Sequence, residues 1–203
     1  MNIIVSQSDK NSYHFRPDNT LIKGSGEYYQ PASIECIEVA PALAIRIDRA
    51  AKGLSKQFAH RYISRCSYGL LIYPEAKEGY LYANNATQAT AILQSTLKTT
   101  LDNTTYISED FISIEEAGGA IISLAIDNQA RQYKIPPVDL LKESIYELIE
   151  RVTIHSSLKT GDLIFMELSP NRSTPDQAVL RIRAGSVISL SVEKSDILNI
   201  QIR

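Results

Sequence analysis

The sequence predicts a mixed α+β fold in which strands predominate. Apolar residues recur with period two through most of residues 163–202, which is the pattern of half-buried strands. Two segments, near residues 55–63 and 138–152, have apolar residues at helical spacing, and strands and helices do not alternate regularly. A chain of 203 residues, 44% of them hydrophobic, is long enough for one substantial core. We therefore expect a single domain over residues 1–203.

The even charge balance limits the classes of partner. Twenty-one basic residues against 23 acidic ones leave a net charge of −2 and no basic footprint for a nucleic acid. No apolar run reaches the roughly 18–20 residues of a membrane helix, and the first residues do not resemble a secretory signal. Cys36 and Cys66 are too few for a disulfide framework. We expect a cytoplasmic protein with two buried thiols and with neither nucleic acid nor membrane as a partner.

In the first half of the chain, residues 1–6 predict a short strand, and turn-rich sequence to residue 30 predicts irregular chain. Residues 34–47 are apolar and partly alternating, which predicts a long strand. Ser55 is placed to cap a helix. The apolar face of that helix holds Leu54, Phe58, Ala59, Tyr62 and Ile63.

The next apolar run, residues 68–73, is expected to stop at Pro74. Residues 84–105 have no clear role, and the Thr and Asn content of residues 84–100 argues against a helix there. Residues 89–93 are compatible with a buried strand, and residues 120–127 predict a long one.

The second clear helix follows Pro136 and Pro137 and covers residues 138–152. Its buried stripe is Leu141, Ile145, Leu148, Ile149 and Val152. The remaining predicted strands are residues 163–168, 178–184, 187–192 and 197–202.

The residues alone reveal no catalytic machinery. His14, His60 and His155 lie apart, and none of them has a neighbouring Ser or Cys in a known nucleophile motif. Gly24 and Gly26 form only a Gly-x-Gly, without the third glycine of a dinucleotide-binding loop. These patterns describe an α+β domain and no reaction.

Several segments in order resemble the fumarylacetoacetate hydrolase family. The C-terminal pair is the most specific: SIYELI at residues 144–149, followed by LKTGDLI at residues 158–164. The earlier segments are FRPDNTLI at residues 15–22, LAIRI at 43–47, the Lys52–Ile63 stretch and Gly69. The resemblance covers roughly residue 15 to the C-terminus. It implies a mostly β-roll fold and a homodimer, with residues 1–14 as a shortened first strand and a remnant of the lid.

The resemblance also implies a reaction. Members of this family use Mg2+ or Mn2+, held by the two Glu of a Glu-x-Glu and by an Asp after the glycine of the next strand. The metal polarises a carbonyl for hydrolysis of a C–C bond, decarboxylation or isomerisation of small keto acids such as acylpyruvates and oxaloacetate.

In this sequence the three ligand positions are Ala40, Ala42 and Leu71, whose side chains offer no oxygen to a hard cation. The substrate-binding Thr-Gly-Thr-Pro loop is replaced by residues 166–169, and the N-terminal His and Glu of the lid have no counterpart. We therefore predict no metal and no other cofactor.

Two functional hypotheses follow. The first is a non-catalytic binding or interaction module with an unknown small-molecule ligand, which forms a homodimer or pairs with a related active subunit. The alternative is a divergent enzyme of the family, acting on a small keto acid at a relocated site. Its weak candidate residues are Arg16, Glu38, Glu75 and Glu167. The alternative requires Arg16, Glu38 and Glu75 to meet in one concave pocket.

Overall fold

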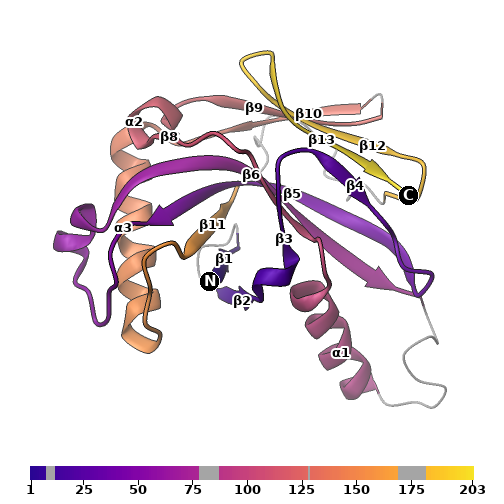
Figure 1. The fold of residues 1–203 in the computed structure, drawn as a ribbon, viewed down its shortest axis with the longest axis horizontal. Helices are drawn as coiled ribbons and strands as arrows, with labels where there is room; N and C mark the ends of the chain where they lie inside the picture. The colour runs from indigo at the N-terminus through magenta and orange to yellow at the C-terminus, as the bar shows by residue number, and fades with distance from the viewer. Residues whose placement is uncertain (8–11, 78–86, 128, 169–181) are drawn as a thin grey trace.

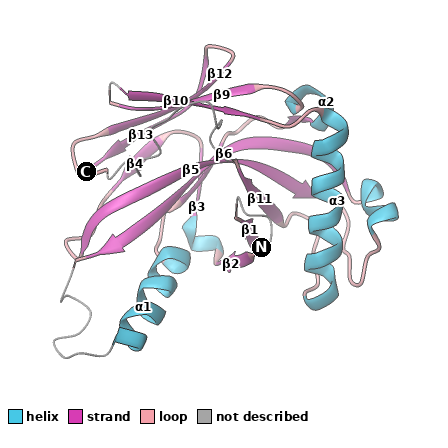
Figure 2. Cartoon of the chain, turned by 180° about the vertical axis from the view of Figure 1, so that it is seen from behind, coloured by secondary structure: helices cyan, strands magenta, loops and turns pink. Residues whose placement is uncertain are grey.

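The computed structural model describes residues 1–7, 12–77, 87–127, 129–168 and 182–203. Two sheets are layered, with the smaller one over part of a larger, strongly curled one (Figure 1). A long helix, α3 (Val138–His155), lies along one side of both layers, and helix α1 (Thr87–Thr100) lies at the opposite end (Figure 2). The predicted mixed α+β fold, with strands predominating, is confirmed.

The larger sheet has eight strands in the described part of the chain, in the order β2-β1-β11-β5-β6-β7-β3, with β8 paired to β6. Its long central strands β5 and β6 are antiparallel and pair along most of their length, with register shifts near both ends of the pair. The bounds are β1 (Ile3–Ser6), β2 (Tyr13–Arg16), β3 (Leu21–Lys23), β5 (Ile34–Ile47), β6 (Ile63–Ala76), β7 (Thr105–Ile107), β8 (Ile112–Ser113) and β11 (Leu163–Glu167).

The smaller sheet has five strands among the described residues, in the order β10-β9-β12-β13-β4. Four of these strands, β9, β10, β12 and β13, come from the second half of the chain, and β4 from the N-terminal segment pairs in parallel with β13. The bounds are β4 (Gly26–Tyr28), β9 (Ile121–Ile126), β10 (Gln129–Lys134), β12 (Val187–Val192) and β13 (Ser195–Ile202).

The main core lies between the two sheets and α3. The predicted stripe of α3 is buried in it, from Leu141 to Val152, because its residues recur every three or four positions and face one side. A short helix, α2 (Ile114–Ala117), packs nearby and begins with a capping box between Ser113 and Glu116. These contacts attach α3 to the same face of the large sheet as the small sheet.

A second cluster, which we call the inner cluster, lies on the other face of the curled sheet. It consists of Ile3, Val5, Ala42, Ala44, Leu71, Ile107, Leu163 and Phe165. All eight side chains are buried, and they come from strands β1, β5, β6, β7 and β11. We call the sheet face that bears them the inner face.

Several predicted elements need correction. Residues 56–61 form a short 3₁₀ helix after Ser55, whose side chain makes no cap hydrogen bond, and Phe58 is 41% exposed. The helical pattern ends there because Ile63 already belongs to β6. The N-terminal region forms strands β2, β3 and β4, where we expected irregular chain after β1. The predicted strand at residues 178–184 lies largely outside the described residues, apart from a bridge between Ile182 and Ile37.

Pro74 does not stop the strand as expected, because β6 continues to Ala76. The amide of Ile37, its neighbour on β5, donates to the carbonyl of Ile182 at 3.0 Å and so points away from β6. This Ile37–Pro74 pair therefore lacks ladder hydrogen bonds, and the proline removes none.

Helix α1 covers Thr87–Thr100, where the Thr and Asn content argued against a helix and residues 89–93 were compatible with a buried strand, so both expectations were wrong. The side chain of Gln94 in this helix hydrogen-bonds to the free edge of β6. The Gln94 amide donates to the carbonyl of Pro74 at 3.0 Å and accepts from the amide of Ala76 at 3.1 Å. These bonds satisfy the carbonyl of Pro74 and the amide of Ala76, which lie on β6 beyond the residues that pair with β7.

Both cysteines are buried thiols, as expected, and burial raises the pKa of Cys66 to about 12. Among the helices that the structure describes, none combines the length and the apolar character required to cross a membrane.

Candidate functional site

The candidate site is the part of the inner face where the two longest strands run side by side. Ala40 on β5 is directly opposite Leu71 on β6, and Ala42 is opposite Gly69. Because paired residues of an antiparallel ladder point to the same face, Ala40, Ala42 and Leu71 are neighbours there. The register therefore brings together the three positions at which the sequence resemblance places metal-binding carboxylates.

The space beside Ala42 and Leu71 holds the apolar side chains of the inner cluster, whereas Ala40 is half-buried. Ala42 and Leu71 are completely buried in the inner cluster together with the ring of Phe165. A Cβ atom at Gly69 would lie 2.7 Å from Cε1 of Phe165 and 2.8 Å from the carbonyl oxygen of Tyr106. Glycine is therefore required at position 69, and the Phe165 ring packs directly onto its backbone.

The side chains present here do not fit a divalent cation. Mg2+ and Mn2+ prefer oxygen ligands, and the methyl and isobutyl groups of Ala40, Ala42 and Leu71 supply none. Within the described ranges of the chain, no group of three or more His, Cys, Asp or Glu side chains is placed to hold a metal ion. The absence of a cofactor itself stays a prediction.

A buried arginine lies beside this apolar region. Arg16 on β2 is 2% exposed, and its Nη1 donates to the carbonyl of Thr104 at 2.8 Å and to Oγ1 of Thr105 at 3.1 Å. Its Nη2 donates to the carbonyl of Ile72 at 3.2 Å. Because β2 and β7 lie near opposite edges of the sheet order, Arg16 connects the two sides of the curled sheet.

Tyr73 links this arginine to a carboxylate. The Arg16 guanidinium carbon lies 4.7 Å from the centre of the Tyr73 ring, and the Tyr73 hydroxyl donates to Oε1 of Glu167. Burial raises the pKa of the Tyr73 hydroxyl, and the charge of Glu167 raises it further. Burial lowers the pKa of Arg16, an effect that Tyr73 and Glu167 oppose. The three side chains therefore form a cation–phenol–carboxylate series, in which Arg16 is buried and Tyr73 and Glu167 are half-buried.

His14 lies at the edge of the same cluster. Its ring centre is 6.4 Å from that of Tyr73, and its buried Nε2 has no hydrogen-bond partner among the described residues. Burial, with a smaller contribution from the Arg16 charge, lowers the pKa of His14 to about 4. The imidazole is therefore neutral at neutral pH.

The four candidates from the sequence are only partly brought together. Arg16 and Glu167 meet through Tyr73, whereas Glu75 accepts a hydrogen bond from the Cys36 thiol at 3.3 Å. Glu38 is half-buried and opposite Tyr73 on the neighbouring strand, so its side chain points to the same face as Tyr73. The pocket that the alternative hypothesis requires would need an accessible Arg16. The guanidinium is instead engaged by the backbone of the fold.

Sequence reasoning overlooked Tyr73, which we treated only as the end of an apolar run. The available signal was a phenol within a buried strand, since a buried tyrosine hydroxyl usually finds a hydrogen-bond partner. The identity of that partner, Glu167, depends on strand pairing across 94 positions of sequence.

Comparison with known proteins places this arrangement in context. No family model and no curated protein matches the sequence. Solved structures match in fold, among them a 2-hydroxyhepta-2,4-diene-1,7-dioate isomerase from Mycobacterium marinum, with a TM-score of 0.75, 14% identity, and coverage of 99% of this chain and 73% of that one. A 5-carboxymethyl-2-hydroxymuconate delta-isomerase from Mycobacterium smegmatis gives a TM-score of 0.72, 16% identity, and coverage of 99% and 78%.

A third match is the fumarylpyruvate hydrolase from Pseudomonas aeruginosa in complex with Mn2+ and pyruvate. Its TM-score is 0.70 at 12% identity, over 100% of this chain and 89% of that one. At these identities the likeness establishes the fold. The chain has the fumarylacetoacetate hydrolase-like fold that its motifs predict.

Proposed function

We propose that this fumarylacetoacetate hydrolase-like protein has lost the divalent-metal chemistry of keto-acid hydrolases and acts as a non-catalytic binding or interaction module. One observation carries the proposal: Ala42 and Leu71 are fully buried in the inner cluster, with Phe165 packed onto Gly69 beside them. At the three family ligand positions a cation would find no oxygen ligand, because Ala40, Ala42 and Leu71 carry only hydrocarbon side chains.

Physical chemistry explains how such a protein stays folded without a metal. Carboxylates gathered around an empty metal site repel one another and pay a desolvation penalty. Apolar side chains at the same positions avoid both costs and add packing. The substitutions at Ala40, Ala42 and Leu71 are thus mutually consistent, which supports a scaffold that no longer depends on the ion.

The alternative, a divergent enzyme with a relocated site, has weaker support. Its central residue, Arg16, donates to Thr104, Thr105 and Ile72 within the fold. A guanidinium held in this way serves the stability of the sheet and is not presented to a substrate. The predicted homodimer, or a pairing with a related active subunit, stays a prediction.

Turnover of keto acids tests the proposal. We expect the purified protein with Mn2+ or Mg2+ to consume oxaloacetate and fumarylpyruvate no faster than the metal ion alone. The reason is that the protein holds no ion in a position to polarise the carbonyl group of the substrate. Loss of the substrate absorbance would be followed with each metal and again with a chelator. The fumarylpyruvate hydrolase from Pseudomonas aeruginosa serves as the positive control on fumarylpyruvate.

Saturable, protein-dependent turnover with a metal would overturn the proposal. The same turnover in chelator would overturn it in favour of the relocated, metal-independent enzyme.

A further inference from the structure

A cavity of about 360 Å³ lies on the inner face at the other ends of the strands that form the candidate site. On β5 it is bounded by Arg46, four positions beyond Ala42, and on β11 by Leu163, four positions before Glu167. Residues from β3, β7 and the segment after β7 complete the wall. The cavity is thus separate from the Arg16, Tyr73 and Glu167 series.

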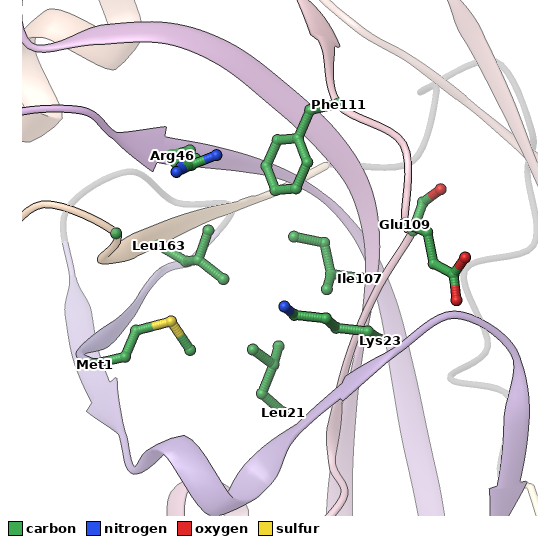
Figure 3. A pocket seen from close by; sticks show the side chains of 10 residues that line it. Met1, Leu21, Lys23, Arg46, Ile107, Glu109, Phe111 and Leu163 are labelled. Atoms are coloured by element: carbon green, nitrogen blue, oxygen red, sulfur yellow. The ribbon is translucent and has the colours of Figure 1, made fainter.

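The wall of this cavity is largely apolar. Leu21, Ile107, Phe111 and Leu163 line it, and all four belong to the inner cluster or pack against it. Figure 3 shows these side chains surrounding the opening, with Leu21 and Leu163 on different sides of it. A cavity of this size with an apolar wall is in the range of small-molecule sites, and its wall favours a ligand with an apolar body.

Two positively charged side chains also line the cavity. Lys23 and Arg46 are exposed, and neither forms an ion pair with any residue that the structure describes. The Arg46 guanidinium carbon lies 6.0 Å from the centre of the Phe111 ring. In Figure 3 the Lys23 side chain reaches across the cavity, while the carboxylate of Glu109 lies away from the Lys23 ammonium.

We propose that this cavity binds a small organic carboxylate with an apolar body, its carboxylate group between Lys23 and Arg46 and its body against Phe111 and Leu163. Arg46 can hold a carboxylate with two parallel hydrogen bonds, and Lys23 adds a second positive charge. An aromatic body fits the face of Phe111. A multiply charged phosphate would leave oxygens against the apolar wall, which makes it a poorer ligand.

Binding of 3-phenylpropionate to the full chain tests this site. Backbone amide chemical shifts would be followed by NMR in chelating buffer, with 3-phenylpropan-1-ol as the neutral isostere. We expect saturable shifts for residues that line the cavity, no comparable binding of the alcohol, and weaker binding at high salt because both cations are exposed.

Matched variants locate the site. Arg46→Gln and Lys23→Gln should each weaken binding about fivefold, the loss expected for one exposed charge pair. Arg65→Gln, which removes an exposed arginine on the neighbouring strand β6 outside the cavity, should leave binding unchanged. All three substitutions are at exposed positions and should preserve the fold.

Several results would overturn the inference: no saturable shifts, shifts confined to residues away from the cavity, equal binding of the alcohol, or undiminished binding in the Arg46→Gln variant. The inference deepens the proposed binding role by naming a site and a ligand class. Its failure is distinguishable from failure of the proposed function, because keto-acid turnover with metal is measured separately from binding in chelator.

Discussion

Replacing Leu71 with aspartate should lower the free energy of unfolding at neutral pH by about 4 kcal/mol. Leu71 is completely buried in the inner cluster, so the variant loses apolar packing and places a carboxylate among hydrocarbon groups. For a chain of this length we expect the melting temperature to fall by roughly 8–16 °C. Chemical denaturation at pH 7 measures the change.

The pH dependence separates the charge from the lost packing. Burial raises the folded-state pKa of the introduced carboxyl above its unfolded value of about 3.9. Its destabilisation is therefore full above the folded-state pKa and diminishes as the pH falls toward the unfolded value. Leu71→Asn, similar in shape and without a charge, should show no such pH dependence relative to the native chain. A tolerated Leu71→Asp variant would mean that position 71 faces water or an ion, contrary to the structure.

Replacing Arg16 with methionine should cost about 3 kcal/mol of stability. The change leaves the buried carbonyls of Thr104 and Ile72 without the Arg16 donors and removes the cation that stabilises Glu167. We expect the melting temperature to fall by roughly 6–12 °C in thermal unfolding followed by circular dichroism. Methionine keeps much of the aliphatic volume, so the loss reports the polar contacts.

The matched control for this variant is Arg65→Met, at an exposed position of β6, which should change stability by no more than about 0.5 kcal/mol. A fully stable Arg16→Met variant would contradict a structural role for the guanidinium. It would favour an arginine held ready for a ligand, and with it the relocated enzyme site.

Long elements with one buried face were predictable from sequence. The strand at Ile34–Ile47 and the helix over Val138–His155 each repeat one periodicity over many residues, so errors at single positions do not obscure them. The predicted stripe of α3 is buried as expected, and the helix only extends three residues further. Local patterns suffice where burial follows a single period.

Elements held by distant partners were not predictable in this way. The sequence of Thr87–Thr100 has little helix propensity, and its attachment depends on Gln94 reaching the free edge of β6. Pro74 is tolerated within β6 only because its neighbour Ile37 donates its amide to Ile182. Both facts belong to strand pairing, which neither propensity nor periodicity encodes.

The candidate site shows the same division. That positions 40, 42 and 71 lack oxygen ligands was evident from the sequence once the motifs were aligned, and the register places them side by side. The surroundings of Arg16 were not evident, because its acceptors lie up to 89 residues away in the chain. The cavity between Lys23 and Arg46 likewise gathers residues from separate strands that carry no shared motif.

Thermal unfolding with and without Mn2+ or Mg2+, after treatment with a chelator, tests the loss of the metal site most directly. A metal bound only to the folded state at about 100 times its Kd stabilises the fold by roughly 2.7 kcal/mol. For this chain that amounts to a rise of roughly 5–11 °C in melting temperature. We predict no rise with either ion at millimolar concentration. A saturable rise would contradict the account and would mean that ligands other than Ala40, Ala42 and Leu71 hold the ion.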